Sequence, residues 1–201
     1  MYNYQLTPLE QWLEEIYRLN SITKVAQLNI TEFSSKLGIW VYFMDIASKT
    51  VELRGLHSIN IDKRLAPRQQ WEDFLHELCH VLRHAGNQIE MPEMYTEMQE
   101  REAESFQMFA AIPYSMLRKL ELPETQGEIV YVVAKEFGVT LQLAKRRIEQ
   151  IHRSLQQHKN DEQTRLLLDG QINKYSSENW SAETRRIMNQ LEKQKLKKGP
   201  V

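Results

Sequence analysis

The stretch "WEDFLHELCHVLRH" at residues 71–84 contains three of the chain's six histidines. The first two, His76 and His80, enclose Glu77 in the pattern His-Glu-x-x-His. Three fixed letters carry little information by themselves, so the surrounding residues must decide between a metal-binding helix and a chance match. The side of the helix on which the histidines lie is therefore the first point to establish.

The apolar residues of this segment gather on one side of a helix plotted at about 100° per residue. They are Trp71, Phe74, Leu75, Leu78, Leu82 and Ala85. His76, His80 and His84 fall roughly on the opposite side. A histidine that only fills the core should point with the apolar residues, so the pattern disfavours a core role. A metal site and a solvated polar face are the two remaining interpretations.

The spacing of the first two histidines suits a metal ion. Residues four apart on a helix stand one turn above each other, so both imidazoles can reach one ion. A catalytic zinc takes three protein ligands and keeps one position for water. Glu77 lies beside His76 and His80, where it can accept a proton from that water without occupying the metal. The histidines are therefore candidate ligands, and Glu77 is the candidate general base.

The third ligand has to come from another element. The segment "EMQEREAESFQMFAAIP" at residues 97–113 offers Glu97, Glu100, Glu102 and Glu104. Glutamate-rich helices are usually just solvated surfaces, which is the competing interpretation here. The buried side of the predicted helix is marked by Ala103, Phe106, Phe109 and Ala110. Glu100 lies one turn before Ala103 at the edge of that side, so the pattern favours Glu100 over Glu104 by a small margin.

The rest of the chain predicts a mixed α+β fold. Residues 7–20 and 30–37 have helical patterns, the second ending at Gly38, and residues 39–46 form a dense β-branched and aromatic run. Two shorter alternating segments follow, so we expect a three-stranded sheet by residue 64. The later elements are a helix from Pro67 to Gly86, a loop over 87–96, a helix over 97–111, a short helix closed by Pro123, and a weak helix over 182–196.

Composition limits the class of protein. The chain has 201 residues and a formal net charge of −1, which provides no overall attraction to nucleic acid or to a membrane surface. Its single cysteine, Cys79, permits no internal disulfide. The N-terminus lacks a basic stretch followed by an apolar one, and no apolar run reaches membrane-spanning length. We therefore expect a soluble cytoplasmic protein with no membrane partner.

The segment "IVYVVAKEFGVTLQLAKRRIEQI" at residues 129–151 has the pattern of a helix-turn-helix. Gly138 marks the turn, Thr140 caps the second helix, and that helix carries Lys145, Arg146 and Arg147. A helical hairpin packed on the rest of the fold is the favoured interpretation, because the wider chain is not basic. Direct DNA binding and docking of a substrate protein are the alternatives.

The segments "HELCHVLRH" (residues 76–84) and "EREAESFQMFAAIP" (residues 100–113) resemble the ImmA/IrrE-type metallopeptidases of bacteria and their mobile elements. That family combines His-Glu-x-x-His, often followed by a histidine four residues later, with a helix of the form Glu-x-x-Ala-x-x-Phe and a proline seven residues further on. The matching positions are Glu100, Ala103, Phe106 and Pro113. The resemblance covers about residues 30–155.

This sequence departs from the family pattern at two positions. The family commonly has glycine where Cys79 stands and alanine where Gln107 stands. We interpret Cys79 as a packed small residue rather than a redox-sensitive or metal-contacting thiol. The replacement of alanine by Gln107 affects only the expected tightness of the local packing.

The resemblance implies roles for the site residues. His76, His80 and Glu100 would bind the metal, and Glu77 would be the general base. Zinc is the expected ion, although two histidines and one carboxylate also suit Mn²⁺ and Fe²⁺. His84 would hydrogen-bond near the helix end rather than bind metal. His84, Tyr95 and Tyr114 are weaker candidates for contacts with the substrate or with a developing oxyanion.

The resemblance also implies a fold and a domain organisation. We expect a zincin-like metallopeptidase domain over residues 1–125, whose small sheet presents an edge strand to extended substrate. A helix-turn-helix-like helical subdomain would follow over residues 126–156. The remaining residues, 157–201, are expected to form a polar, partly disordered C-terminal tail.

The function implied by the resemblance is that of a zinc-dependent, site-specific endopeptidase. Its substrate would be a transcriptional repressor with a helix-turn-helix DNA-binding domain, and cleavage would release genes of a prophage, an integrative element or a stress response. The alternative is a non-catalytic regulator that binds the repressor or DNA through the helix-turn-helix-like part. Glu77 favours the enzyme, because a binding module has no need of a carboxylate beside the metal.

Overall fold

Two short helices open the described part of the chain. The computed structural model describes residues 4–53, 56–84, 92–174 and 180–198. Helix α1 spans Pro8–Leu19, and its N-terminus is capped by Thr7, whose side chain accepts a hydrogen bond from the N–H of Glu10. A single 3-10 turn, η1 (Val25–Gln27), precedes helix α2 (Ile30–Leu37). Gly38 ends α2 in the left-handed region at φ 68°, as its sequence position predicts.

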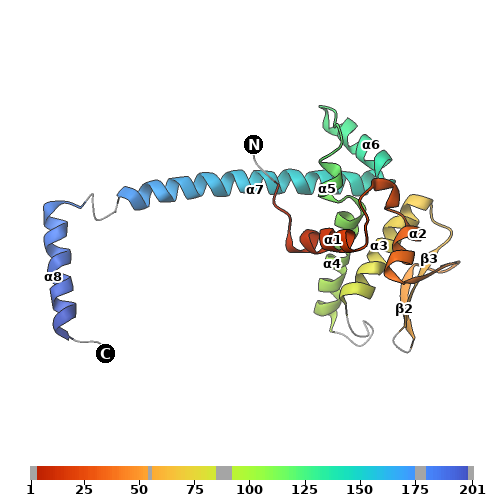
Figure 1. Cartoon of the computed structure of the whole chain (residues 1–201), viewed down its shortest axis with the longest axis horizontal. Helices are drawn as coiled ribbons and strands as arrows, with labels where there is room; N and C mark the ends of the chain where they lie inside the picture. The colour runs from red at the N-terminus through yellow and green to blue at the C-terminus, as the bar shows by residue number, and fades with distance from the viewer. Residues whose placement is uncertain (1–3, 54–55, 85–91, 175–179, 199–201) are drawn as a thin grey trace. The chain divides into compact units, whose positions relative to one another are not determined.

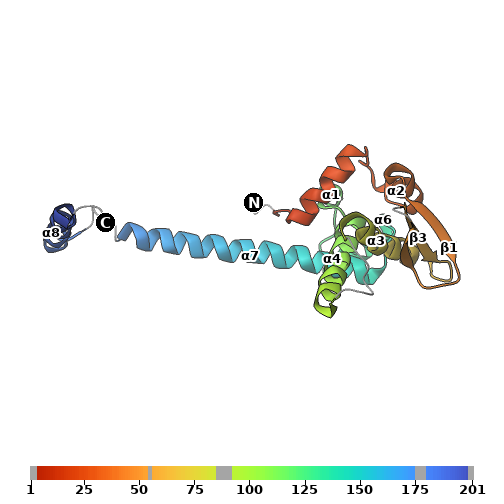
Figure 2. The same cartoon turned by 90° about the horizontal axis from the view of Figure 1, so that it is seen from below.

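A three-stranded sheet follows, which confirms the prediction of an α+β fold (Figure 2). Its strands are β1 (Trp40–Met44), β2 (Lys49–Leu53) and β3 (Leu56–Asp62), in the order β1-β3-β2. The central strand β3 is parallel to β1 and antiparallel to β2. Its Ile59 and Ile61 are fully buried. Strand β2 therefore forms one edge of the sheet.

Helix α3 (Pro67–Arg83) lies between the sheet and helix α4 (Glu93–Ala111), and it packs against both (Figure 1). Its predicted apolar side is confirmed for Trp71, Phe74, Leu75 and Leu78, which are all buried. Leu82 is partly exposed, and Ala85 lies outside the described residues. The helix ends three residues before the expected Gly86, which lies outside the described residues. Its C-cap is His84, whose backbone leaves the helical region at φ −107° and ψ 123°.

Helix α4 begins earlier than the sequence predicts. The expected loop over 87–96 is wrong from Glu93 onward, and its first part lies outside the described residues. Pro92 starts the helix, since its carbonyl accepts hydrogen bonds from the N–H groups of Tyr95 and Thr96. The predicted buried side of α4 is confirmed by Ala103, Phe106, Phe109 and Ala110, which are each at most 7% exposed.

Three further helices complete the element order before the C-terminal end. They are α5 (Tyr114–Leu117), α6 (Gln126–Glu136) and α7 (Leu141–Lys174). Gly138 turns the chain between α6 and α7 at φ 65°, and Thr140 caps α7 by accepting the N–H of Leu143. The chain divides into two compact units after His152, so α7 contributes to both.

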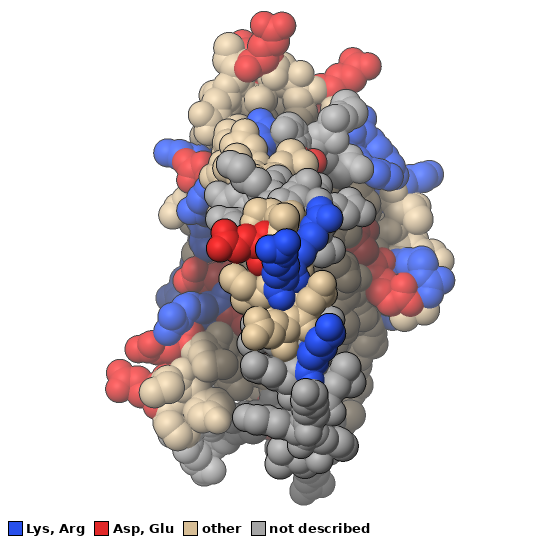
Figure 3. Space-filling view, turned by 90° about the vertical axis from the view of Figure 1, so that its left-hand side faces the viewer, with Lys and Arg blue, Asp and Glu red and all other residues tan. Residues whose placement is uncertain are grey.

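The part of the chain after His152 differs in secondary structure from the sequence prediction. Helix α7 continues to Lys174, whereas the sequence predicts a polar, partly disordered tail from residue 157 with no helix before 182. The reason is that no proline interrupts 141–174 and polar pairs such as Gln157 with Asp161 lie one turn apart. Helix α8 (Ala182–Lys198) agrees with the predicted weak helix. Basic and acidic side chains are interspersed on the face drawn in Figure 3.

A helix must be long and strongly apolar to cross a bilayer, and this requirement applies to each helix within the described ranges. None of them combines enough residues with enough apolar character to cross a membrane.

Candidate metal centre

The histidine face of α3 is covered rather than solvated. Its apolar face packs on the core, and the opposite face meets α4. The side chains of His76, His80 and His84 are consequently only 22%, 10% and 7% exposed. This burial excludes the solvated-face interpretation of the motif.

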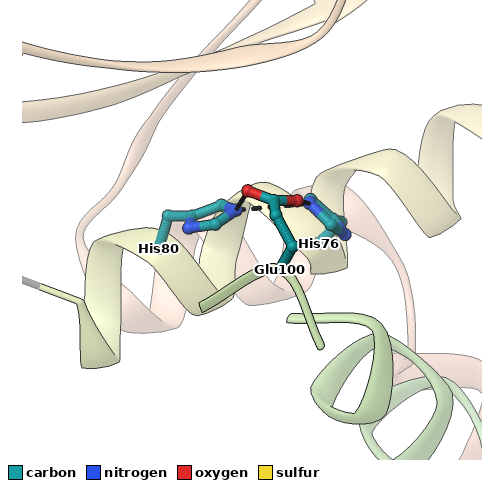
Figure 4. A group of neighbouring side chains, drawn as sticks. All are labelled: His76, His80 and Glu100. Carbon is teal, nitrogen blue, oxygen red and sulfur yellow. Dashed lines mark hydrogen bonds and ion pairs between the residues drawn. The ribbon is translucent and has the colours of Figure 1, made fainter. Parts of the chain in front are cut away.

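His76 and His80 direct their Nε2 atoms toward the carboxylate of Glu100, which comes from α4 (Figure 4). One ligand atom from each of the three residues lies within 4.8 Å of the others, and the group could hold a metal ion. Glu100 and His76 are 24 positions apart in the sequence, so their proximity does not follow from local helix geometry. Its position follows from the packing of α4 across α3.

The spacing of these atoms fits a small tetrahedral ion. Zinc binds nitrogen and oxygen at about 2.0–2.1 Å, which places neighbouring ligand atoms roughly 3.3 Å apart in a tetrahedron. The two histidine Nε2 atoms are 3.2 Å apart. The carboxylate oxygens of Glu100 lie 3.1 Å from Nε2 of His76 and 3.5 Å from Nε2 of His80. The donor set is therefore arranged as an ion of this size requires.

The four glutamates of α4 that were candidates for the third ligand have four different surroundings. Glu100 faces the histidines, whereas Glu97 pairs with Arg101 one turn along the same helix. Glu104 pairs with Arg146 of α7 at 3.0 Å. Glu102 contacts Arg83 and His84 at the end of α3. The structure thus separates Glu100 from Glu104, which the sequence pattern distinguishes by only a small margin.

Glu77 lies on the side of α3 that meets strand β2. The backbone N–H of Thr50 donates to Oε2 of Glu77 at 2.6 Å, and the Thr50 hydroxyl lies 3.0 Å from the same oxygen. Burial raises the pKa of Glu77 above its ordinary value, and the hydrogen bonds from Thr50 offset part of that rise. A carboxyl with a raised pKa is a better proton acceptor near neutral pH. Sequence reasoning misses Thr50, because its contact depends on the packing of β2 against α3.

Burial also sets the protonation of two neighbours on α3. The pKa of His80 falls to about 4, first because burial disfavours the charged ring and then because of the nearby His76. His80 is therefore neutral at neutral pH, as a metal ligand must be. Cys79 is fully buried, and burial raises the pKa of its thiol to about 12. Such a thiol is unreactive, in keeping with its interpretation as a packed small residue.

The three weaker candidates for substrate contact lie in different places. Tyr95 is 60% exposed in the first turn of α4. Tyr114 packs its ring against Tyr4, with the ring centroids 4.4 Å apart. His84 is buried, and both of its ring nitrogens have side-chain partners. Among the described contacts, none joins either tyrosine to His76, Glu77 or Glu100, so an oxyanion role for them stays a prediction.

Of the three basic residues at 145–147 of α7, Arg147 lies in the core, whereas the side chains of Lys145 and Arg146 are 66% and 43% exposed. Arg147 is completely buried and pairs with buried Glu10 of α1 at 2.6 Å. Its Nε also donates to the backbone carbonyl of Ile112, and its guanidinium lies 4.8 Å from the ring centre of Phe109. The cap residue Thr140 donates its N–H to Glu72 of α3 at 2.6 Å. These contacts support a packed hairpin and remove Arg147 from any surface that could contact DNA.

The fold and the site together define a class. A small mixed sheet, a His-Glu-x-x-His helix and a glutamate from the next helix form a zincin-like α+β domain with a candidate metal site. The sequence matches the family model of the IrrE N-terminal-like domain, a peptidase family, over residues 34–149, and the chain belongs to this family. The resemblance drawn from the two sequence motifs is thereby confirmed.

Two proteins of Bacillus subtilis (strain 168) are similar to the chain over most of its length. The phage-like element PBSX protein XkdA is 35% identical over 148 residues, which cover 74% of this chain and 75% of XkdA. The uncharacterized protein YqaB is 34% identical over 155 residues, which cover 77% of this chain and 90% of YqaB.

Proposed function

We propose that the chain is a zinc-dependent, site-specific endopeptidase. The observation that carries this proposal is the convergence of His76, His80 and Glu100, with the non-ligand Glu77 held beside them by Thr50. Membership of a peptidase family supports the same reaction class. Zinc is proposed because two imidazoles and one carboxylate are its usual catalytic donors, although Mn²⁺ and Fe²⁺ accept the same set.

The following catalytic roles are proposed for the side chains of the site. Zinc held by the three ligands would polarise the scissile carbonyl and lower the pKa of its bound water toward neutrality. Glu77 would take the proton released by the attacking water and return it to the leaving amine. Thr50 occupies Oε2 of Glu77, so Oε1 is the oxygen available for this transfer.

Strand β2 is proposed to bind the extended substrate. The backbone N–H of Thr50 points away from β3, toward Glu77. Backbone groups of alternate residues in a strand face the same edge, so those of Glu52 lie on the same outer side as those of Thr50. A peptide added along this edge would run beside Glu77, as β-augmentation requires.

The proposed substrate is a transcriptional repressor with a helix-turn-helix DNA-binding domain. Two facts support this proposal: the sequence motifs resemble those of ImmA/IrrE-type peptidases, and the similar XkdA is named as a protein of a phage-like element. Cleavage would then act as an anti-repressor mechanism. A specific protein substrate requires docking contacts outside the candidate metal site, for which the α6–α7 hairpin offers a surface.

The test is incubation of the purified, zinc-loaded protein with the repressor encoded nearest to its gene, alongside Glu77→Gln. We expect specific fragments from the wild type and a rate roughly 10²–10⁴-fold lower for the variant, because a general base is lost. Equal cleavage by both proteins would overturn the role of Glu77. Relief of repression in cells by Glu77→Gln, with no fragments, would instead establish a non-catalytic regulator.

A further inference from the structure

The second ring nitrogen of His80 begins a chain of hydrogen bonds that leads away from the metal site. Nδ1 of His80 lies 2.9 Å from Nδ1 of His84. Nε2 of His84 in turn lies 3.1 Å from Oε2 of Glu102 on α4. The side chain of His84 thus connects the proposed ligand His80 to the carboxylate of Glu102, which lies outside the candidate metal site.

The directions of these hydrogen bonds follow from the chemistry of the groups. An ionised carboxylate only accepts, so Nε2 of His84 carries the proton donated to Glu102. A neutral imidazole has one donor and one acceptor nitrogen, so Nδ1 of His84 accepts. The proton between the two rings then resides on Nδ1 of His80. This arrangement leaves the lone pair of His80 on Nε2, the atom that faces His76 and Glu100.

The carboxylate at the end of this chain is firmly held. Arg83 donates its Nε proton to Oε1 of Glu102 at 2.6 Å, while Oε2 accepts from His84. The guanidinium of Arg83 lies over the ring of Trp12, 4.9 Å from its centre. Each oxygen of Glu102 therefore has its own donor. One of these donors, Arg83, also makes a cation–π contact with Trp12 of α1.

We propose that His84 and Glu102 are positioning residues that fix the tautomer and the ring orientation of His80. This inference rests on the proposed metal site, but it gives neither residue a contact with the metal. Metal-binding histidines commonly donate their second N–H to a carboxylate or a carbonyl. Here an intervening imidazole extends that link to α4. Helix α4 thus supplies the ligand Glu100 and, two residues later, the carboxylate that orients His80.

Zinc affinity measured by competition with a chromogenic chelator tests the proposal without using peptidase activity. We expect His84→Ala and Glu102→Ala to bind zinc about 10–100-fold more weakly than the wild type. Glu102→Gln keeps an acceptor for His84 and should retain most of the affinity. The matched control is Glu104→Ala, which removes a carboxylate of the same helix that pairs with Arg146. Thermal unfolding of the metal-free proteins verifies that each variant folds.

Histidine ¹⁵N NMR of the zinc-loaded protein supplies a second readout that a purely structural role would not predict. We expect a proton on Nε2 of His84 and a proton on Nδ1 of His80, with the first signature lost in Glu102→Ala. Wild-type zinc affinity in both alanine variants, or a proton on Nδ1 of neutral His84, would overturn the inference and leave the metal site standing. Failure of the wild type to bind zinc would overturn the metal site and the inference together.

Discussion

Two regions of this molecule carry polar motifs that suggest a function, and their charged side chains have different partners. Between α3 and α4, Glu100 turns toward two imidazoles and the donors converge on one point. Between α7 and its neighbours, Arg147 is neutralised in the core by Glu10, and Arg146 pairs with Glu104. In the first region the donor atoms face one possible metal position. In the second region the ion pairs join α7 to α1 and α4.

This difference shows which structural feature indicates that a sequence motif marks a metal site. His-Glu-x-x-His gains chemical meaning because a third donor arrives from a separate helix with the spacing of an ion. The basic run 145–147 has no such convergence, because Arg147 points inward to Glu10 and the carbonyl of Ile112. Convergence of metal-ligand atoms from two helices on one point is thus the feature that distinguishes the first region from the second.

The largest expected effect comes from breaking the buried pair of the second region. Arg147→Ala leaves Glu10 as an uncompensated buried charge, so we expect a loss of about 3–5 kcal/mol in the free energy of unfolding. Urea denaturation measures this loss. The control is Arg146→Ala, whose partly exposed pair with Glu104 should contribute about 1 kcal/mol or less. Equal and small effects of both variants would show that Arg147 is not a core residue.

A smaller effect should appear as a pH dependence of the metal-site region. The pKa of His80 is about 4 in the folded protein, compared with about 6.5 for an unfolded chain. As the pH falls from about 6.5 to about 4, the unfolded state binds a proton that folded His80 does not. The metal-free protein should therefore lose stability over this interval.

Urea unfolding at pH 7 and pH 5 in the presence of a chelator checks this prediction. His80→Gln removes the titrating ring, so its stability difference between the two pH values should be smaller than that of the wild type. The comparison cancels contributions from Glu77 and other groups common to both proteins. An unchanged difference would mean that the ring of His80 is not buried in the neutral form.

The smallest expected effect concerns the contact between Thr50 and Glu77. Thr50→Val removes the hydroxyl but keeps the backbone N–H that donates to the carboxylate. We expect a decrease in kcat of roughly threefold to tenfold, the equivalent of one hydrogen bond, with KM unchanged. Steady-state kinetics with the proposed repressor substrate provides the measurement. A change confined to KM would assign Thr50 to substrate binding instead.

Much of the fold follows from local sequence patterns. The apolar side of α3, the buried side of α4, the Gly38 stop and the Thr140 cap all depend on residues within a few positions of one another. The metal-ligand candidates His76 and His80 share one helix, so their proximity also follows from spacing. These features are predictable because helix geometry alone fixes them.

The features that escaped prediction depend on contacts between distant segments. Glu10 is only 3% exposed although charged residues of an amphipathic helix normally face water, and its partner Arg147 lies 137 positions away. The link from Thr50 to Glu77 spans 27 positions and requires β2 to pack on α3. Glu100 and Glu104 both flank the buried side of α4, and only the positions of α3 and α7 decide between them.

Zinc stoichiometry tests the central claim most directly. Metal analysis of the purified, dialysed protein should find one zinc per chain in the wild type and in Glu104→Ala. Glu100→Ala removes one of three ligands, so its affinity should fall by more than the roughly 10–100-fold expected for a residue that only supports a ligand, and its zinc should be lost on dialysis. Zinc retained in full by Glu100→Ala would contradict the assignment of His76, His80 and Glu100 as the metal site.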